Sequence, residues 1–169
     1  MNICIASDHA GFDAKQDLIC HLRNTGHAVS DCGTHSDESC DYPDYAAVVA
    51  RAVSTGACDR GILICGTGIG MSLVANRFEG VRSAVVHSDY TVEVSRTHND
   101  ANVLCLGSRV LSQDQMRRFT EVFITTEFAD ERHSRRIGKL MSYDDPDTRA
   151  AIPPPAPFQT GACPGEPSG

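Results

Sequence analysis

A cysteine followed by three alternating glycines is the part of this chain best suited to chemistry. Cys65 ends an apolar run over residues 62–64, and Gly66, Gly68 and Gly70 follow it before an apolar-periodic helix begins. A strand, a glycine loop and a helix in this order present backbone N–H groups that bind anions and oxyanions. A thiol near a helix N-terminus can have its pKa lowered from about 8.5 towards neutrality, and then serves as a base or nucleophile. We therefore expect an active site at this loop; the alternative is a buried structural cysteine.

Three familiar functions of glycine loops are excluded, because this chain lacks residues that each of them requires. A Cys-x₅-Arg phosphatase loop needs arginine where this chain has Met71. A nucleotide-binding P-loop needs Gly-Lys-Ser/Thr, which is absent, and the dinucleotide fingerprint Gly-x-Gly-x-x-Gly/Ala is broken after Gly68. What remains is a thiol beside preset hydrogen-bond donors.

Two further polar pairs follow or precede predicted strands. Asp8 and His9 come directly after an apolar strand, where they either contact a ligand or cap the next helix. His98 and Asn99 close a helix. A histidine there either caps the helix, favoured by its dipole, or serves as a general acid with a near-neutral pKa.

A basic cluster stands out in an acidic protein. Arg132 and Arg136 lie one helical turn apart and share a face, so that together they can bind a phosphate; the alternative is a solvated basic face. Arg109, just after a predicted strand, is better placed for a ligand anion.

The elements that must position these residues alternate between strand and helix. Strands are expected at residues 2–6, 27–32, 60–65, 81–87 and 103–107, and helices at 11–25, 44–55, from Gly70 onward, at 89–98, from Ser112 to about Phe128, and at 130–142. This order predicts an α/β fold with a parallel sheet covered by helices on both faces. Ligands bind such sheets at the carboxyl ends of the strands, where Asp8, Cys65 and Arg109 fall.

The composition of the chain argues against several classes of function. The chain has 169 residues, 41% hydrophobic and 22% charged, with a formal net charge of −7. The acidic balance argues against broad binding to nucleic acid or anionic membranes, and no apolar run is long enough to span a membrane. The eight cysteines form no Cys-x-x-Cys pair and no zinc spacing, so we expect reduced thiols in a cytoplasmic protein without a metal.

A boundary is expected near residue 143. Seven of the eight prolines lie from Pro146 onward. We therefore expect a domain over residues 1–142 and a proline-rich, disordered tail over 143–169.

Several motifs together resemble the ribose-5-phosphate isomerase type B group of the ribose/galactose phosphate isomerase family. The motifs are Ser-Asp-His-Ala-Gly-Phe (7–12), Asp-Tyr-Pro (41–43), Gly-Ile-Leu-Ile-Cys-Gly-Thr-Gly-Ile-Gly-Met-Ser (61–72), Ala-Asn-Arg-Phe (75–78), His-Asn-Asp-Ala-Asn-Val-Leu (98–104) and Gly-Ser-Arg-Val (107–110). They follow the order of the family over residues 1 to about 142.

The resemblance implies a Rossmann-like, three-layer α/β/α sandwich with a five-stranded parallel sheet. It also implies a homodimer, with a tetramer as the alternative, whose active sites lie between subunits and use no metal or cofactor. Cys65 corresponds to the family's proton-transferring cysteine, His98 to its ring-opening histidine, and Thr67 to a catalytic residue of the oxyanion loop. The substrate-binding residues that the resemblance implies are Asp8, His9, Tyr42, Gly66, Thr67, Gly68, Ile69, Gly70, Asn99, Arg109, Arg132 and Arg136.

The activity that the resemblance implies is the interconversion of ribose 5-phosphate and ribulose 5-phosphate through an enediolate. One alternative is another sugar phosphate, such as allose or galactose 6-phosphate, with the pocket near Tyr42 and Met71 deciding between them. A second alternative is a sugar-phosphate-binding protein without catalysis.

Overall fold

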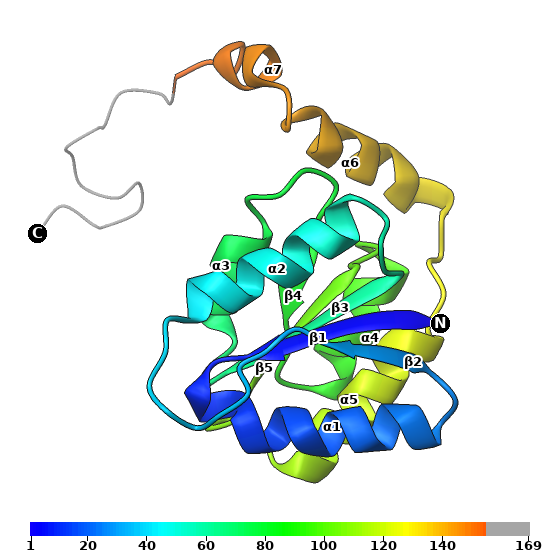
Figure 1. The fold of residues 1–169 in the computed structure, drawn as a ribbon. Coiled ribbons are helices and arrows are strands. Elements are labelled where there is room, and N and C mark those ends of the chain that lie inside the picture. The colour runs from blue at the N-terminus through cyan, green and yellow to red at the C-terminus, as the bar shows by residue number, and fades with distance from the viewer. Residues whose placement is uncertain (155–169) are drawn as a thin grey trace, which may run out of the picture.

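The computed structural model describes residues 1–154 and is built around one sheet of parallel strands (Figure 1). The strand order is β2-β1-β3-β5-β4. The strands are β1 (Asn2–Ser7), β2 (Ala28–Asp31), β3 (Arg60–Cys65), β4 (Ser83–Val85) and β5 (Val103–Gly107). The predicted five-stranded parallel sheet is confirmed.

Helices cover both faces of the sheet and complete three layers (Figure 1). One core lies between the sheet and α1 (Phe12–Asn24), α4 (Asp89–Thr97) and α5 (Gln113–Thr125), and it includes Leu18 and Phe119. The other lies beneath α2 (Tyr42–Ser54) and α3 (Ile69–Ala75), and it includes Val49 and Met71. A short 3₁₀ helix, η1 (His9–Gly11), joins β1 to α1.

Local signals explain where several helices begin and end. The Ser112 side chain accepts a hydrogen bond from the Gln115 amide, and the Gln115 side chain accepts one from the Ser112 amide, which forms a capping box at the start of α5. Gly26 has a φ of 88° just beyond α1, as expected for a helix-ending glycine. Pro43 lies in the first turn of α2, where its missing N–H costs nothing, so this helix begins two residues before the predicted start at 44.

The edge strand β4 is shorter than the predicted 81–87 because it pairs only with β5, through Ser83, Ala84 and Val85. Beyond α5, helix α6 (Glu131–Ser142) and the short helix α7 (Pro146–Ala150) extend outside the three layers (Figure 1). In the part of the chain that the structure describes, no helix is both long enough and apolar enough to cross a membrane.

Helix α7 corrects part of the expected disorder after residue 143. The Asp145 carboxylate accepts hydrogen bonds from the amides of Asp147 and Thr148, and Pro146 occupies the first helical position. A helical turn therefore forms despite the proline-rich composition. Residues 155–169, where the rest of the predicted tail and Cys163 fall, lie outside the described residues.

Candidate active site

The chain reverses its direction across the sheet between β1 and β3. After β1 it adds β2 on one side, and it then returns to place β3 on the other side of β1. In parallel α/β sheets, ligands bind at the carboxyl ends of the two strands that flank this switch point. Asp8 follows β1 and Cys65 ends β3, so two of the predicted site residues lie at this switch point.

Cys65 lies in a cradle made by its own loop. Its side chain is 6% exposed, and its Sγ accepts a hydrogen bond from the Gly68 amide at 3.1 Å. Gly68 has a φ of 79°, a conformation that glycine adopts without strain. The Thr67 hydroxyl accepts a hydrogen bond from the Ile69 amide at 3.4 Å, which orders the next part of the loop.

The loop after β5 packs against the cradle and fixes its shape. A Cβ added at Gly107 would lie 2.8 Å from Thr67 Cα, so only glycine allows this close approach. The amides of Ser108 and Arg109 donate to the carbonyl oxygens of Cys65 (2.8 Å) and Gly66 (3.0 Å). The cradle is therefore held by backbone contacts from a neighbouring strand.

Arg109 brings a positive charge to the cradle. Its Cδ, Nε and Nη1 atoms lie 3.3–3.4 Å from the position that a Cβ at Gly66 would occupy. Its guanidinium is thus placed beside the glycine loop, as expected for a residue that binds a ligand anion.

Asp8 and His9 both take part in local hydrogen bonds. Asp8 Oδ1 accepts hydrogen bonds from the amides of Ala10 (2.9 Å) and Gly11 (3.2 Å), so the carboxylate caps η1. The Asp8 amide donates to the carbonyl of Ile64 at 3.1 Å, which holds this turn against the end of β3. His9 Nδ1 accepts a hydrogen bond from the Cys40 amide at 3.3 Å. Capping and ligand contact are compatible for Asp8, because a carboxylate has two oxygens.

Tyr42 covers the start of α3 from the neighbouring helix α2. Its ring atoms lie 2.7 Å from the position that a Cβ at Gly70 would occupy, and the residue is 37% exposed. Met71, next to Gly70 on α3, is 0% exposed and packs into the core beneath α2 and α3. Residues 70 and 71 are neighbours on a helix and point in different directions, so only one of them reaches the Tyr42 side.

A second group of predicted site residues lies at the other end of the strands, near the start of β5. His98 caps the end of α4, and its ring stacks on His133 of α6 with centroids 4.2 Å apart and planes 12° apart. Arg132 Nε lies 3.4 Å from His133 Nε2. Both His98 and Arg136 line a surface pocket of about 320 Å³, together with Asn99.

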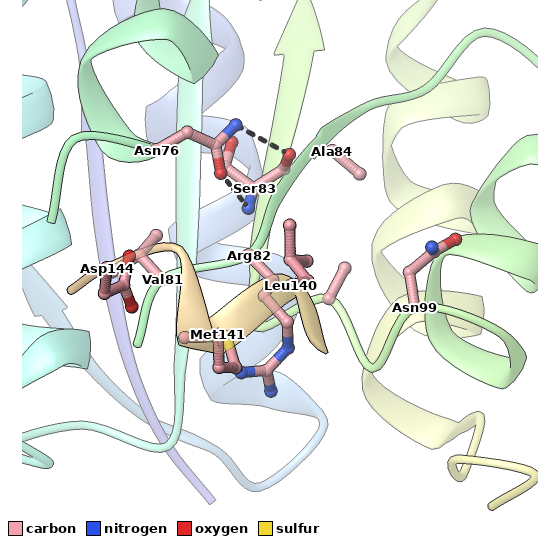
Figure 2. A pocket seen from close by; sticks show the side chains of 10 residues that line it. Asn76, Val81, Arg82, Ser83, Ala84, Asn99, Leu140, Met141 and Asp144 are labelled. Carbon is pink, nitrogen blue, oxygen red and sulfur yellow. Dashed lines mark hydrogen bonds between the residues drawn. The ribbon is translucent and has the colours of Figure 1, made fainter. Parts of the chain in front are cut away.

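A larger pocket of about 370 Å³ adjoins this one (Figure 2). Asn99 and Leu140 line both. In Figure 2 it lies between α6, which contributes Met141, and the start of β4, where Arg82 precedes the strand and Ser83 begins it.

One chain does not bring the two groups together. Cys65 pairs with Gly107 at the end of β5, whereas His98 precedes Val103 at its start. A strand of five residues spans about 13 Å, which is too far for Cys65 and His98 of one chain to act on the same carbons of a small ligand. The predicted residues thus form two separate halves, which we call the thiol half (Asp8, His9, Tyr42, residues 65–70 and Arg109) and the histidine half (His98, Asn99, Arg132 and Arg136).

Sequence reasoning missed Ser108, which joins two parts of the thiol half. Its hydroxyl donates to the carbonyl of Ala10 at 2.7 Å and lies 3.2 Å from the carbonyl of Cys65. The available signal was its place between Gly107 and Arg109 at the end of a strand.

Burial keeps three other thiols of the chain in their protonated form. The seven cysteines among the described residues are all free. Burial raises the pKa of Cys4 and of Cys32 to about 11, and the pKa of the fully buried Cys105 to about 12. These three thiols stay protonated at neutral pH, which disfavours them as bases.

Comparisons with known proteins show the family to which the chain belongs. A family model described as Ribose/Galactose Isomerase matches residues 3–140. The chain is 43% identical over 142 residues to ribose-5-phosphate isomerase B of Escherichia coli, covering 84% of this chain and 95% of that protein. It is 43% identical over 149 residues to a putative sugar phosphate isomerase of Bacillus subtilis, covering 86% and 98%.

Solved structures that resemble this chain include ribose-5-phosphate isomerases of type B. Ribose-5-phosphate isomerase B of Clostridium thermocellum superimposes with a TM-score of 0.84 at 45% identity, covering 85% of this chain and 97% of that one. The Mycoplasma genitalium enzyme, solved with bound ribulose-5-phosphate, has a TM-score of 0.82 at 41% identity and covers 85% and 95%.

Proposed function

The chain belongs to the ribose/galactose isomerase family, and on this premise we propose that it interconverts ribose 5-phosphate and ribulose 5-phosphate. The observation that carries the proposal is the cradle around Cys65, in which the Gly68 amide hydrogen-bonds the sulfur and Arg109 lies over Gly66. A base beside oriented amides and a cation suits a proton transfer that creates an oxyanion on a phosphorylated substrate.

The first step is ring opening, because aldose phosphates are mostly cyclic. His98 moves the ring proton, and its stacking on His133 supports this role by holding the imidazole in one plane. Asn99, beside it in the pocket with Arg136, contacts the sugar hydroxyls.

The second step is proton transfer between carbons. Cys65, as the thiolate, takes the proton from C2 of the open aldose, and the resulting thiol returns it to C1, while the proton of the O2 hydroxyl passes to O1. The enediolate between these events carries negative charge on oxygen. The amides of residues 66–70 and the Thr67 hydroxyl stabilise it, each such donor being worth about 3–4 kcal/mol in comparable sites.

Binding groups away from the reacting carbons orient the substrate. Asp8, His9 and Tyr42 surround the sugar. Arg109, Arg132 and Arg136 bind the phosphate, whose binding energy then positions C1 and C2 against the thiolate.

We propose that two copies of the chain form a homodimer in which the thiol half of one meets the histidine half of the other. The separation of the halves along β5 supports this arrangement. Apolar side chains exposed on α2 and α3 support it as well: Val48 is 51% exposed, Ile69 54% and Leu73 66%. Ile69 and Leu73 are four residues apart and share one face of α3, so they give a second copy a continuous apolar contact.

The free thiols favour a reducing compartment, and we propose that the protein is cytoplasmic. The function as a whole is tested by following conversion of ribose 5-phosphate to ribulose 5-phosphate with a chelator present. Turnover supports the proposal, and a requirement for an added metal or nicotinamide nucleotide contradicts it.

A further inference from the structure

Asp100 has an unusual backbone conformation directly after His98 and Asn99. Its φ is 44°, in the left-handed region that residues other than glycine seldom adopt. Aspartate tolerates this region better than most residues, but the conformation still needs support from its surroundings. The strained position lies between the end of α4 and the start of β5. Its backbone conformation therefore sets the direction of the chain directly after His98 and Asn99.

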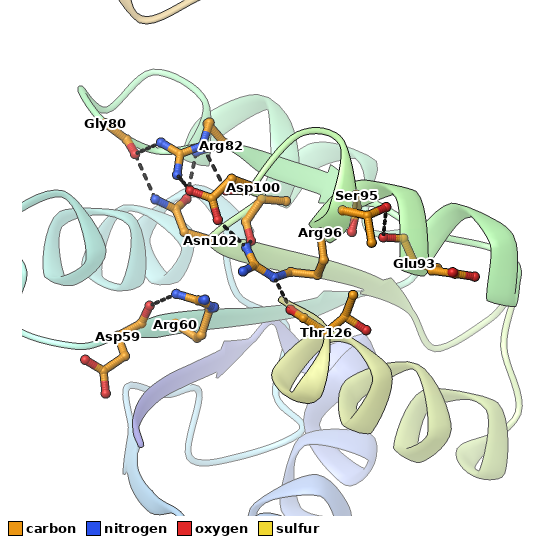
Figure 3. Close-up of polar contacts among 12 residues, drawn as sticks. Asp59, Arg60, Gly80, Arg82, Glu93, Ser95, Arg96, Asp100, Asn102 and Thr126 are labelled. Atoms are coloured by element: carbon orange, nitrogen blue, oxygen red, sulfur yellow. Dashed lines mark hydrogen bonds and ion pairs between the residues drawn. The ribbon is translucent and has the colours of Figure 1, made fainter. Parts of the chain in front are cut away.

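Two arginines hold the Asp100 carboxylate from different elements (Figure 3). Arg82, just before β4, donates from Nη2 to Oδ2 at 2.7 Å, and its Nε donates to the Asp100 carbonyl at 2.8 Å. Arg96, on the last turn of α4, donates from Nη1 to Oδ1 at 2.8 Å and to the Ala101 carbonyl at 2.6 Å. We call Arg82, Arg96 and Asp100 the arginine clamp.

Arg96 is the buried member of the clamp, whereas the side chains of Arg82 and Asp100 are 17% and 32% exposed. Arg96 is 2% exposed, and a guanidinium in that position is costly without a carboxylate partner. Arg60 brings a third guanidinium to the region (Figure 3). Burial and the neighbouring Arg96 lower the pKa of Arg60, while Asp100 acts in the opposite direction. Asp100 therefore counterbalances a locally positive cluster.

The clamp also reaches the elements that carry the rest of the histidine half. Arg96 Nε donates to the Thr126 carbonyl at 3.2 Å, just beyond α5, and the Ala129 amide donates to the Thr97 carbonyl at 3.1 Å. Arg82 Nη1 lies 3.8 Å from Met141 Sδ on α6. The same arginines thus connect the end of α4 to the segment that leads into α6 and to α6 itself, which bears Arg132, His133 and Arg136.

We propose that Asp100 is a positioning residue, which through Arg82 and Arg96 sets the orientation of His98 for ring opening. The inference rests on the proposed isomerase function and extends it to a residue that does not touch substrate. Neutralising Asp100 breaks its ion pairs with both guanidiniums and loosens the hold on the turn that follows His98, which turns His98 away from its stacked position. Misplacement of a catalytic group by about 1 Å can cost 100-fold in rate.

The test is Asp100→Asn in the full chain, because asparagine also tolerates the left-handed region. Its side chain is neutral and keeps a single acceptor oxygen, so it can serve only one of the two arginines that Asp100 holds. Two kinds of measurement are made. The first is kcat and KM for ribose 5-phosphate. The second is the inhibition constant of an acyclic four-carbon phosphorylated aldonic acid, whose carboxylate imitates the enediolate and which needs no ring opening. We expect kcat to fall about 10- to 100-fold while the inhibition constant stays within about 3-fold.

Asp89→Asn is the matched control. Asp89 lies at the other end of α4 and pairs with Arg118 at 2.7 Å, so this variant also removes one ion pair from the same helix. It should leave both quantities unchanged. Assays are run at a temperature where melting curves show every variant to be folded.

Arg82→Met and Arg82→Lys test the clamp from its other side. We expect Arg82→Met to reproduce the loss in kcat and Arg82→Lys, which keeps the charge, to recover part of it. If Asp100→Asn does not fold, these two variants test the proposed positioning role of the clamp in its place.

An unchanged kcat in Asp100→Asn overturns the inference, and so does an equal loss in kcat and in inhibitor binding, since that result indicates a merely structural role. If the wild-type chain isomerises no aldose phosphate, the proposed function itself fails and the inference with it. The wild-type assay therefore separates the two failures.

Discussion

The Gly68 amide points at the sulfur of Cys65, with the nitrogen 3.1 Å from Sγ. This contact joins the candidate base to the loop that would bind the oxyanion, so the geometry of the loop and the reactivity of the thiol are linked. The shape of the loop in turn depends on the glycine of the neighbouring strand that packs on Thr67.

Gly107→Ala should damage catalysis more than folding. The added methyl would meet Thr67 Cα at 2.8 Å, and because the contacting atoms are backbone, the loop must move. We expect kcat to fall at least 10-fold, since oxyanion donors act only when correctly placed, by analogy with losses of about 100-fold for a deleted donor. Steady-state kinetics and a thermal melt measure both effects.

Gly26→Ala is the control for this variant. Gly26 also has a positive φ, of 88°, but a Cβ there meets nothing within 4 Å. It should lower stability by about 1 kcal/mol and leave kcat unchanged. Equal kcat in wild type and Gly107→Ala would show that the cradle does not depend on this contact.

Arg136→Ala should mainly raise KM. Arg136 lines the pocket beside His98, where it would bind phosphate and make no contact with the reacting carbons. We expect KM for ribose 5-phosphate to rise about 10-fold or more, as for loss of a charged hydrogen bond of roughly 1.5–3 kcal/mol. Arg135→Ala, an exposed neighbour on the same helix, is the matched control. An unchanged KM in Arg136→Ala would move the phosphate site elsewhere.

Mixing two inactive variants should restore activity if the site is shared between copies. Cys65→Ala damages the thiol half and His98→Asn the histidine half. In a mixed dimer one site then receives both lesions and the other neither. After co-refolding in equal amounts, about a quarter of wild-type activity should return, because half of the dimers are mixed and each has one intact site.

Cys65→Ala mixed with Arg109→Ala is the control for complementation. Both lesions lie in the thiol half, so every site in a mixed dimer has one of them, and activity should stay at the average of the two parents. Recovery in this control, or none in the Cys65→Ala and His98→Asn mixture, would contradict the shared site.

The ion pair between Lys15 and Asp31 should make stability depend on acid pH. Lys15 is 0% exposed, and its Nζ lies 2.5 Å from Asp31 Oδ1. Burial opposes ionisation of Asp31, but hydrogen bonds from Lys15 and from the Gly33 amide outweigh it and lower the pKa of Asp31. A lowered folded-state pKa stabilises the fold above the unfolded value of about 3.9, and this contribution is lost as pH falls through the folded-state pKa.

Asp31→Asn should therefore be destabilised at neutral pH by about 3–5 kcal/mol, because it leaves a buried ammonium unpaired. The gap between wild type and variant should begin to narrow as the pH falls below about 4, where unfolded Asp31 becomes protonated, and should close as the pH passes through the lowered folded-state pKa of Asp31. Urea unfolding at a series of pH values measures this gap. A gap that is constant with pH would show that the pair does not contribute as described.

Much of the fold could be predicted because its strands are buried on both faces. The runs ending at Cys65 and Gly107 read as continuous apolar segments, and their bounds match β3 and β5. The edge strand β4 was predicted too long, since sequence carries no information about how many partners a strand has. Helix α7 was missed because the capping by Asp145 was hidden within a proline-rich stretch.

The candidate site was harder to predict than the fold. The spacing of the residues identified the thiol, the glycines and the arginines. The division into two halves could not be identified in this way, because it depends on the direction and pairing of the strands, which place Cys65 and His98 at opposite ends of β5. The burial of Met71 beside the exposed Tyr42 could not be predicted, because the rotation of a helix relative to its neighbour is not visible in sequence. The clamp on Asp100 joins residues from three separate segments, and no local pattern indicates it.

The most direct test compares wild type with Cys65→Ala in a coupled assay for ribulose 5-phosphate formation with chelator present, together with binding of ribose 5-phosphate to each. Cys20→Ala, which removes an exposed thiol, is the control. We expect wild type and Cys20→Ala to turn over equally, and Cys65→Ala to be inactive while remaining folded and binding the sugar phosphate. Turnover by Cys65→Ala close to that of wild type would contradict the assignment of this sulfur as the base.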